Sequence, residues 1–453
     1  MMTVTTARLN LRSADSRGVQ GILRALDRDH LASERPELAG LVNWREGRSL
    51  PIHRWLRYRE GFSPSLITAL GLGDRILDPF SGSGSIMLGA AQLSRSAVGI
   101  DVNPLAAFAS RVKLSPLTAA EIRQVRAFYA SVTSAVKTVT PSAAPKLKIV
   151  EKVFEPEILD TLLALRAAIE QSAGTDATRK FLHLAWLSVL EPVGSYFKEG
   201  NGIKYRNRKR LRVGYELRPD GDWQLARFGP DQRSFVVQRF QRQVAEMLSD
   251  VSAWSKGTWS QQRVIEGNSI EETARLDRAS FDSVIFSPPY ANRFDYFESQ
   301  KVELWFGGFV SDYADMGALR RRSLRSHLGA DLGREAELIP DLEALIERID
   351  PDSYAVRMRV PALLRGYFAD MRAILTQSRR LLRRKGKCHI VVGNSAYGGV
   401  IIPTDTLIAR IGLEQGFTHA TVHPVRHLTV APQQRLDLIG QESYMRESIV
   451  ELA

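Results

Sequence analysis

The sequence predicts an α/β protein whose doubly wound, mostly parallel sheet is interrupted by a helical insertion. Strand patterns alternate with helical patterns after Asp74, which implies parallel strands joined by crossover helices. A glycine-rich turn links the first of these strands to its helix. A long span of helical patterns then separates the second strand from the third.

Residues 1–50 are expected to form a helical lead-in, with a helix in VQGILRALDRDHLA and a loop after it. In 51–114, DRILDPF predicts an apolar strand, SGSGS a tight turn and IMLGAAQLSR a helix. SAVGIDVNP predicts a second strand that ends at the acid Asp101, and LAAFASRVK predicts a further helix. This strand–helix–strand unit is the first half of the predicted sheet domain.

Residues 115–260 break the alternation and are expected to form the insertion. Helical patterns occur in TAAEIRQVRAFYASVTSAVK, EPEILDTLLALRAAIEQ, ATRKFLHLAWLSVLEPV and RSFVVQRFQRQVAEMLSDVSAW. Between the last two helices, KEGNGIKYRNRKRLRVGYELRPDGDW is expected to be a basic loop that contains glycine.

Strand patterns resume in 261–453. They occur in QRVIEGNS, in DSVIFSPPY and, after the long helix GYFADMRAILTQSRRLLRRKG, in CHIVVGNSAYGG. HATVHPVRHLTV and RESIVEL predict two closing strands at an edge of the sheet. Open α/β sheets bind their ligands at the carboxyl ends of the strands, so the residues after these strands are candidate site residues.

The composition is that of a basic, soluble globular protein. The 453 residues carry a formal net charge of +12, with basic runs at KYRNRKRLR, LRRRSLR and SRRLLRRKGK. Three such runs favour a nucleic acid as partner, without distinguishing DNA from RNA. No apolar run is long enough to span a bilayer and no secretory signal begins the chain, so we expect a cytoplasmic location away from membranes. The single cysteine, Cys388, excludes an internal disulfide and a multi-cysteine zinc site, and no metal is expected.

The turn DPFSGSGS is a candidate ligand site. It lacks the Gly-Lys-Ser/Thr of a Walker loop, and Met87 stands where a dinucleotide fingerprint requires its third glycine. Asp101, however, lies close to the spacing at which a carboxylate binds ribose hydroxyls. A turn that admits a nucleoside, with a ribose-binding acid and no phosphate clamp, favours S-adenosylmethionine.

Two motifs together resemble those of the S-adenosylmethionine-dependent amino-methyltransferases of DNA. The family's Phe-x-Gly-x-Gly cofactor motif matches Phe80, Gly82 and Gly84, and its Asp/Asn/Ser-Pro-Pro-Tyr catalytic motif matches SPPY at 287–290. Serine in first position is most typical of enzymes that methylate N4 of cytosine. The resemblance implies a Rossmann-like class I methyltransferase fold, with a cofactor-binding half in 51–114 and a catalytic half in 261–453.

The resemblance also implies individual site residues. Phe62, Ser63 and Pro64 match a further motif that helps to hold the methionine end of the cofactor, and EGNS would line the adenine pocket. The expected cofactor-binding residues are Phe62, Ser63, Pro64, Asp78, Phe80, Gly82, Gly84, Asp101, Asn103, Asn268 and Ser269. The expected catalytic residues are Ser287, Pro288, Pro289 and Tyr290.

The Ser-Pro-Pro-Tyr turn suits methyl transfer to the amino nitrogen of a base. The lone pair of that nitrogen is delocalised into the ring, and two acceptors on its N–H bonds would localise the lone pair. The Ser287 hydroxyl and the Pro288 main-chain carbonyl are the expected acceptors, and the prolines fix the direction of the carbonyl. Tyr290 is expected to stack on a base that has left the duplex. Transfer is then direct between aligned reactants and needs no strong base.

The expected partner is double-stranded DNA with an extrahelical base. The insertion, as a target-recognition region, and the loop after Tyr290 are the expected contacts. No nuclease pattern occurs, so cleavage would belong to a separate restriction or defence-system subunit. The expected nucleic-acid-binding residues are Lys204, Arg206, Arg208, Lys209, Arg210, Asn292 and Arg293.

Other activities compete with this interpretation. N6 of adenine in DNA is the second choice of base, and RNA amino-methyltransferases use related turns. Protein-glutamine methyltransferases normally begin the motif with Asn, and a non-catalytic nucleic-acid-binding subunit would not need the intact glycines and Ser287. A C5-cytosine enzyme is excluded because the only thiol, Cys388, begins a predicted buried strand. A zinc deaminase is excluded because the sequence lacks a set of cysteines and histidines spaced to bind zinc.

Overall fold

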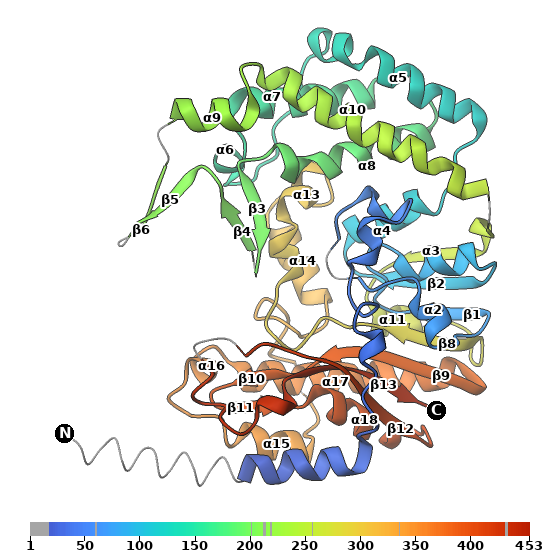
Figure 1. Cartoon of the computed structure of the whole chain (residues 1–453), viewed down its shortest axis with the longest axis vertical. Coiled ribbons are helices and arrows are strands. Elements are labelled where there is room, and N and C mark those ends of the chain that lie inside the picture. The colour runs from blue at the N-terminus through green and yellow to red at the C-terminus, as the bar shows by residue number, and fades with distance from the viewer. Residues whose placement is uncertain are drawn as a thin grey trace.

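The computed structural model describes residues 18–58, 61–200, 202–211, 214–217, 220–255, 257–334, 336–430 and 434–453. Residues 1–17 of the predicted lead-in and Arg212 of the first basic run lie outside this description; the lead-in helix covers 18–30. A seven-stranded sheet forms the centre of the molecule, in the order β12–β13–β9–β8–β1–β2–β7 (Figure 1). Its strands are β1 (Arg75–Asp78), β2 (Ser96–Asp101), β7 (Gln262–Glu266), β8 (Phe281–Phe286), β9 (Leu382–Gly393), β12 (Ala420–His427) and β13 (Arg446–Leu452).

The order of the strands makes the sheet doubly wound. From β1 the chain runs outward through β2 to β7, then returns to the other side of β1 and runs outward through β8 and β9. These five strands are parallel, while β13 is antiparallel to both of its neighbours, β9 and β12. The predicted fold class is confirmed, and the predicted closing strands do lie at the edge. The order reverses between β1 and β8, which is where such sheets bind ligands.

Alternating strand residues fill two hydrophobic layers, one on each face of the sheet. Ile76 and Ile285 belong to the first layer and Leu77 and Val284 to the second. The first layer contains α3 (Ser85–Gln92), α4 (Pro104–Lys113) and the insertion. The second contains α17 (Val360–Leu381), α18 (Thr404–Glu414) and the lead-in helix. The predicted long helix ends at Leu381, earlier than expected, because the following LRRKG begins β9.

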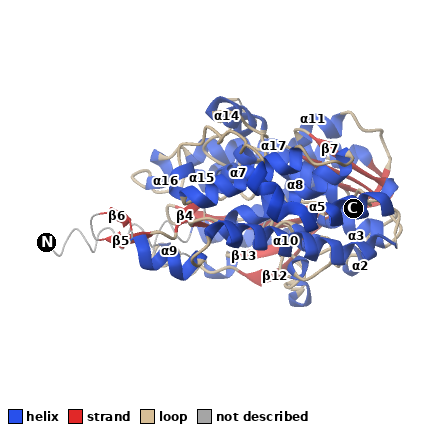
Figure 2. Cartoon of the chain, turned by 90° about the horizontal axis from the view of Figure 1, so that it is seen from above, coloured by secondary structure: helices blue, strands red, loops and turns tan. Residues whose placement is uncertain are grey.

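The insertion consists of helices and two hairpins. The helices are α5 (Ala119–Thr138), α6 (Val150–Val153), α7 (Pro156–Glu170), α8 (Asp176–Val193), α9 (Asp220–Phe228) and α10 (Gln232–Asp250). The predicted basic loop was wrong: β3 (Tyr196–Glu199) pairs with β4 (Gly202–Tyr205), and β5 (Arg208–Leu211) with β6 (Gly214–Leu217). Gly200, at a φ of 53°, supplies the left-handed conformation that a tight hairpin turn requires. Hairpin β5–β6 projects from the body of the molecule in both views (Figures 1 and 2).

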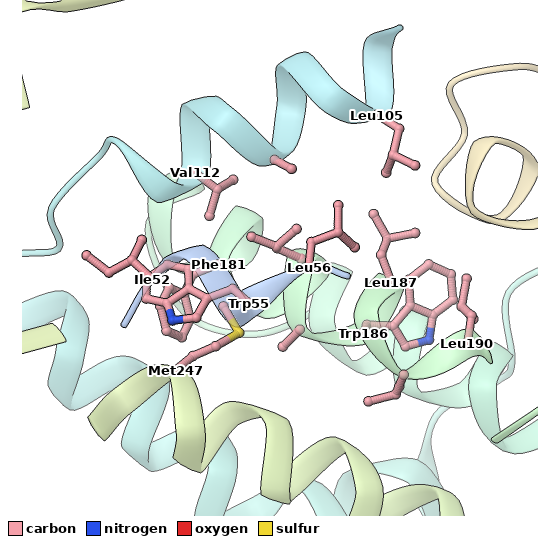
Figure 3. Close-up of a cluster of buried hydrophobic side chains, with 14 of the residues drawn as sticks. Ile52, Trp55, Leu56, Leu105, Val112, Phe181, Trp186, Leu187, Leu190 and Met247 are labelled. Atoms are coloured by element: carbon pink, nitrogen blue, oxygen red, sulfur yellow. The ribbon is translucent and has the colours of Figure 1, made fainter. Parts of the chain in front are cut away.

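The insertion shares its hydrophobic core with the sheet domain. Figure 3 shows side chains from residues 52–56, α4, α8 and α10 meeting in one cluster, including Trp55 and Phe181. The Trp55 ring lies edge-on to that of Phe181 at 5.2 Å between centroids. At the end of α10, the buried Asp250 carboxylate accepts hydrogen bonds from the Trp55 indole, the Arg54 guanidinium and the Ile52 main chain. A core with buried polar ties fixes the position of the insertion.

Short elements complete the chain. No helix among the described residues is long and apolar enough to cross a membrane. The remaining helices and strands are α2 (Leu66–Ala69), α11 (Ser269–Ala274), α12 (Tyr296–Ser299), α13 (Lys301–Phe306), α14 (Tyr313–Arg322), α15 (Pro340–Ile346), α16 (Tyr354–Arg357), β10 (Ser395–Tyr397), β11 (Val400–Ile402), and the 3-10 helices η1 (Pro36–Leu38), η2 (Glu46–Arg48), η3 (His53–Trp55), η4 (Val251–Ser255), η5 (Trp259–Gln261) and η7 (Glu442–Tyr444).

Candidate active site

A cavity of about 680 Å³ lies at the carboxyl ends of β1, β2, β7 and β8, beside the point where the strand order reverses. It brings together residues of both sequence motifs. The Phe80 ring packs against Phe286, the last residue of β8, at 5.5 Å between centroids. The predicted site residues that line it are Phe80, Gly82, Asp101, Asn103, Asn268, Ser269, Ser287, Pro288, Pro289, Tyr290 and Asn292.

The glycine-rich turn requires glycine at two positions. Gly82 has a φ of 51° and Gly84 a φ of 85°, a region that other residues rarely adopt. A Cβ atom on Gly82 would lie 2.8 Å from the Tyr58 ring, and one on Gly84 would lie 2.8 Å from the Ser110 hydroxyl. Glycine is required at both positions because the Tyr58 ring and Ser110 occupy the space that a side chain would need, and Gly82 also borders the cavity.

The two acids beside the turn differ in their surroundings. The Asp101 carboxylate borders the cavity and accepts hydrogen bonds from the main-chain N–H groups of Gly82 and Asn103, both at 2.8 Å. Asp78 lies beneath the turn, where its buried carboxyl accepts the Phe80 N–H at 3.1 Å. Burial, with a smaller effect from the charge of Asp101, raises the pKa of Asp78 to about 8. Asp78 does not line the cavity, so its geometry supports the turn and not a contact with a ligand.

Three other predicted cofactor residues have defined structural bonds. Asn103 accepts the Leu105 N–H at the start of α4 and donates to the Gln300 side chain at 2.6 Å. Asn268 begins α11 by accepting the Ile270 N–H at 2.8 Å, and the Ser269 hydroxyl donates to the Pro79 carbonyl. These bonds tie the ends of β2 and β7 to the surroundings of the cavity.

The Phe62-Ser63-Pro64 motif is buried beside the turn. Phe62 lines a smaller cavity of about 280 Å³, together with Ser83 and Ser85 of the turn. Pro64 packs beneath α3, since a Cβ atom on Gly89 would lie 2.7 Å from the Pro64 side chain. The Ser63 hydroxyl accepts the Ser65 N–H. The two cavities share lining residues, so the cavity beside Phe62 is a neighbour of the main one.

The Ser-Pro-Pro-Tyr turn directly follows β8. Its tyrosine is held by residues of β9 and β13. The Tyr290 hydroxyl donates to Glu447 Oε1 at 2.8 Å, and Arg426 donates to Glu447 Oε2 at 2.6 Å. The ring lies over Gly393 at the end of β9, where a Cβ atom would approach it to 2.9 Å. Burial and the charge of Glu447 raise the pKa of Tyr290 well above its usual value. Sequence reasoning missed Glu447 and Arg426; both line the cavity, and their positions at the site edge of two predicted strands were the available signal.

The loop after Tyr290 adds aromatic side chains to the cavity. Phe294, Tyr296 and Phe297 line it, with the first two rings 4.6 Å apart between centroids. Asn292 is exposed and accepts the Phe294 N–H. Arg293 does not line the cavity: its guanidinium lies 5.7 Å from the Tyr354 ring centroid and 5.8 Å from that of Tyr397.

The tip of hairpin β3–β4 reaches this loop. Gly200 at the tip lines the cavity, and β4 contacts α12. Lys198 forms an ion pair of 2.8 Å with Glu303 of α13, and both side chains are largely buried. Tyr196 also lies against Glu303, with its hydroxyl 3.5 Å from the carboxylate. The insertion is thereby connected to the segment that follows the catalytic motif.

The described parts of the three basic runs lie on different elements. In the first, Lys204 is exposed, Arg206 donates to the Tyr196 carbonyl, and Arg208, Lys209 and Arg210 lie on β5. In the second, Arg320 pairs with Asp295 and Glu298, and Arg325 is buried against Asp370. The third lies at the amino end of β9, the edge of the sheet away from the cavity. Of the second run, Arg322 is exposed and lines the cavity, whereas Arg320 and Arg325 are paired with acids.

The order of the sheet, the glycine turn and the cavity at the switch point define an α/β Rossmann-like methyltransferase fold. The chain is 25% identical over 456 aligned residues to the type II methyltransferase M.BsoBI of Geobacillus stearothermophilus, across 90% of this chain and 87% of that protein. It is 22% identical over 409 residues to the type II methyltransferases M.AvaI of Nostoc sp. and Anabaena variabilis, across 83% of this chain and 81% of each. No family model matches the chain. These homologues confirm the resemblance to methyltransferases that the two motifs indicated.

Proposed function

We propose that this protein transfers a methyl group from S-adenosylmethionine to an exocyclic amino group of an extrahelical base in DNA, N4 of cytosine being the first choice. The observation that carries the proposal is the single cavity bordered by both the glycine turn and the Ser-Pro-Pro-Tyr turn. Homology to type II methyltransferases supports DNA methylation. The serine at position 287 supports cytosine over adenine.

The cofactor site fits a nucleoside that lacks a pyrophosphate. The main chain at Gly82 and the carboxylate of Asp101, which both border the cavity, would hold the ribose end, and Asn268 and Ser269 border the space for the adenine. The smaller cavity beside Phe62 would receive the methionine end. When bound, S-adenosylmethionine supplies the activated methyl group.

The residues of the Ser-Pro-Pro-Tyr turn would prepare the target nitrogen. The Ser287 hydroxyl and the Pro288 carbonyl accept its two N–H bonds, which localises the lone pair for attack in line with the methyl group. Tyr290 offers its face to the base, and its ring is fixed in advance by Glu447 and Gly393. The aromatic residues of the following loop would cover the base and exclude water.

DNA contacts are proposed for the insertion and for the loop after Tyr290. Lys204, with Arg208, Lys209 and Arg210 on β5, would bind phosphates from the projecting hairpins, and Asn292 is exposed at the cavity. Arg206 and Arg293 are proposed to support the segments that contact DNA. The Arg206 guanidinium lies against Phe197, and the Arg293 guanidinium lies against Tyr354 and Tyr397. The location proposed is the cytoplasm, and any nuclease would be a separate subunit.

The test is methyl transfer from labelled S-adenosylmethionine to duplex DNA and to total RNA, each digested to nucleosides for mass spectrometry. We expect N4-methylcytosine in DNA, lost in Ser287→Ala and retained in the matched control Ser280→Ala at the other end of β8. N6-methyladenine in DNA would keep the mechanism and correct the base. A methylated base in RNA alone would refute the choice of DNA.

A further inference from the structure

One wall of the cavity comes from a segment to which the sequence assigned no role. Asn43, Trp44, Arg45 and Arg48, with Arg57 and Tyr58, line the cavity and form what we call the tryptophan wall. The wall lies next to the cofactor turn, because the Tyr58 ring covers Gly82. Trp44, Arg48, Arg57 and Tyr58 also border the smaller cavity, so the wall spans both spaces.

Hydrogen bonds hold the tryptophan wall in position. The Asn43 side chain donates to the Ala39 carbonyl at 2.9 Å and accepts the Arg45 N–H at 3.0 Å. The Glu46 carboxylate accepts the Ser65 hydroxyl at 2.9 Å, which ties the segment to the end of the Phe62-Ser63-Pro64 motif. The segment is therefore held in one place before any ligand arrives.

The charges on the wall are available to a ligand. Arg45, Arg48 and Arg57 are exposed. Arg57 has a carboxylate of Glu191 at 3.5 Å, whereas neither Arg45 nor Arg48 forms an ion pair with any residue that the structure describes. The Arg48 guanidinium lies 3.5 Å from the centroid of the Trp44 ring, and stacking on the ring leaves its N–H edge free to bind an anion.

The position of the wall indicates which anion it meets. A base that enters the cavity remains attached to its strand, so the phosphates on either side of that nucleotide must pass the mouth of the cavity. Guanidinium groups match two phosphate oxygens at once, and an indole offers a face for stacking. This reasoning rests on the proposed function.

We propose that the tryptophan wall is a binding site for the DNA backbone beside the extrahelical nucleotide. Arg45 and Arg48 bind the phosphates, and Trp44 holds Arg48 in the binding orientation. The site is distinct from the hairpins of the insertion and acts on the target strand itself.

The experiment compares two charge-matched double variants. Arg45→Ala/Arg48→Ala removes two charges from the wall, and Arg384→Ala/Lys385→Ala removes two exposed charges at the amino end of β9, away from the cavity. For each, the Kd for a DNA duplex is measured at several salt concentrations, and the Kd for S-adenosylmethionine is measured alone. Trp44→Ala is added as a variant that changes no charge.

We expect the wall variant to lower the slope of log Kd against log salt by about 2, one for each lost phosphate contact. DNA binding at low salt should weaken at least about tenfold, while the β9 control leaves both values near those of the wild type. Trp44→Ala should weaken DNA binding with the salt slope unchanged. An unaltered cofactor Kd shows that each variant is folded.

Two results would overturn the proposal. One is an equal loss of salt dependence in the wall and β9 variants, which would make the effect one of net charge alone. The other is a weaker cofactor Kd with DNA binding intact, which would assign the wall to the carboxylate of S-adenosylmethionine. A wild-type protein that binds DNA but methylates no base would refute the proposed function, whereas a salt slope lowered only in the wall variant would still identify the wall as a site for DNA phosphates.

Discussion

The bond between Tyr290 and Glu447 allows a sharp test of how the target base is held. Tyr290→Phe removes the hydroxyl that donates to Glu447 at 2.8 Å and keeps the aromatic face. A hydrogen bond to a charged group contributes about 1.5–3 kcal/mol, and 1.4 kcal/mol corresponds to about a tenfold change in rate. The ring keeps its packing on Gly393, so we expect the lower end of that range: a loss in kcat of about tenfold.

The assay is single-turnover methylation of a duplex, with the KM for DNA measured alongside kcat. Glu447→Ala should lower kcat by a similar factor, and the double variant should lose little more than either single variant, because both changes remove the same bond. Tyr313→Phe, at an exposed tyrosine of α14, is the matched control. Additive losses in the double variant would refute the claim that Glu447 acts through Tyr290. Complete inactivity of Tyr290→Phe would mean that the hydroxyl takes a direct part in transfer.

Three further predictions concern the turn and the core. Gly82→Ala should weaken cofactor binding more than Gly71→Ala does. Both glycines have a positive φ, but only at Gly82 would the new Cβ lie 2.8 Å from the Tyr58 ring. Calorimetric titration of both variants with the cofactor checks this, and equal effects would contradict it. Asp250→Ala should lower the free energy of unfolding by at least about 2 kcal/mol, since it leaves the buried N–H groups of Ile52 and Trp55 without an acceptor; denaturant titration that finds less than about 1 kcal/mol would contradict it. The raised pKa of Asp78 means that between about pH 4 and pH 8 the folded state holds a proton that the unfolded state has released. The contribution of Asp78 to the free energy of unfolding is therefore full below pH 4 and is lost as the pH rises towards 8. Asp78→Asn should flatten this dependence of the unfolding free energy on pH in denaturant titrations, and an unchanged dependence would contradict the assignment.

The fold was predictable because its signals are local. Strand and helix periods, the glycine turn and the prolines after β8 each lie within a short stretch of sequence. The hairpins were missed because charge masked their alternation, although Gly200 supplied a turn signal. Gly82 and Gly84 were predicted from the cofactor motif, and the structure gives both a positive φ that favours glycine.

The rest of the site depends on contacts between distant residues. Glu447 and Trp44 reach the cavity from opposite ends of the chain; the strand pattern around Glu447 gave one signal, whereas the sequence around Trp44 gave none. Asp78 was predicted to bind the cofactor because it adjoins the motif, but strand alternation turns its side chain beneath the turn. The basic runs show the same limit: Arg320 pairs with Asp295 and Glu298, whereas its neighbour Arg321 forms no ion pair with a residue that the structure describes.

The ion pair between Lys198 and Glu303 bears on how new DNA specificities could arise in this protein. Suppose that the insertion selects the DNA sequence and is replaced by the insertion of a relative. Then α12 and α13 would face a hairpin from another protein, and Glu303 would be buried without Lys198 as its cation. Such a carboxylate is costly to bury. We therefore expect exchangeable specificity units to extend beyond the insertion and to include residues 296–306, so that recombination between relatives succeeds only when both segments travel together.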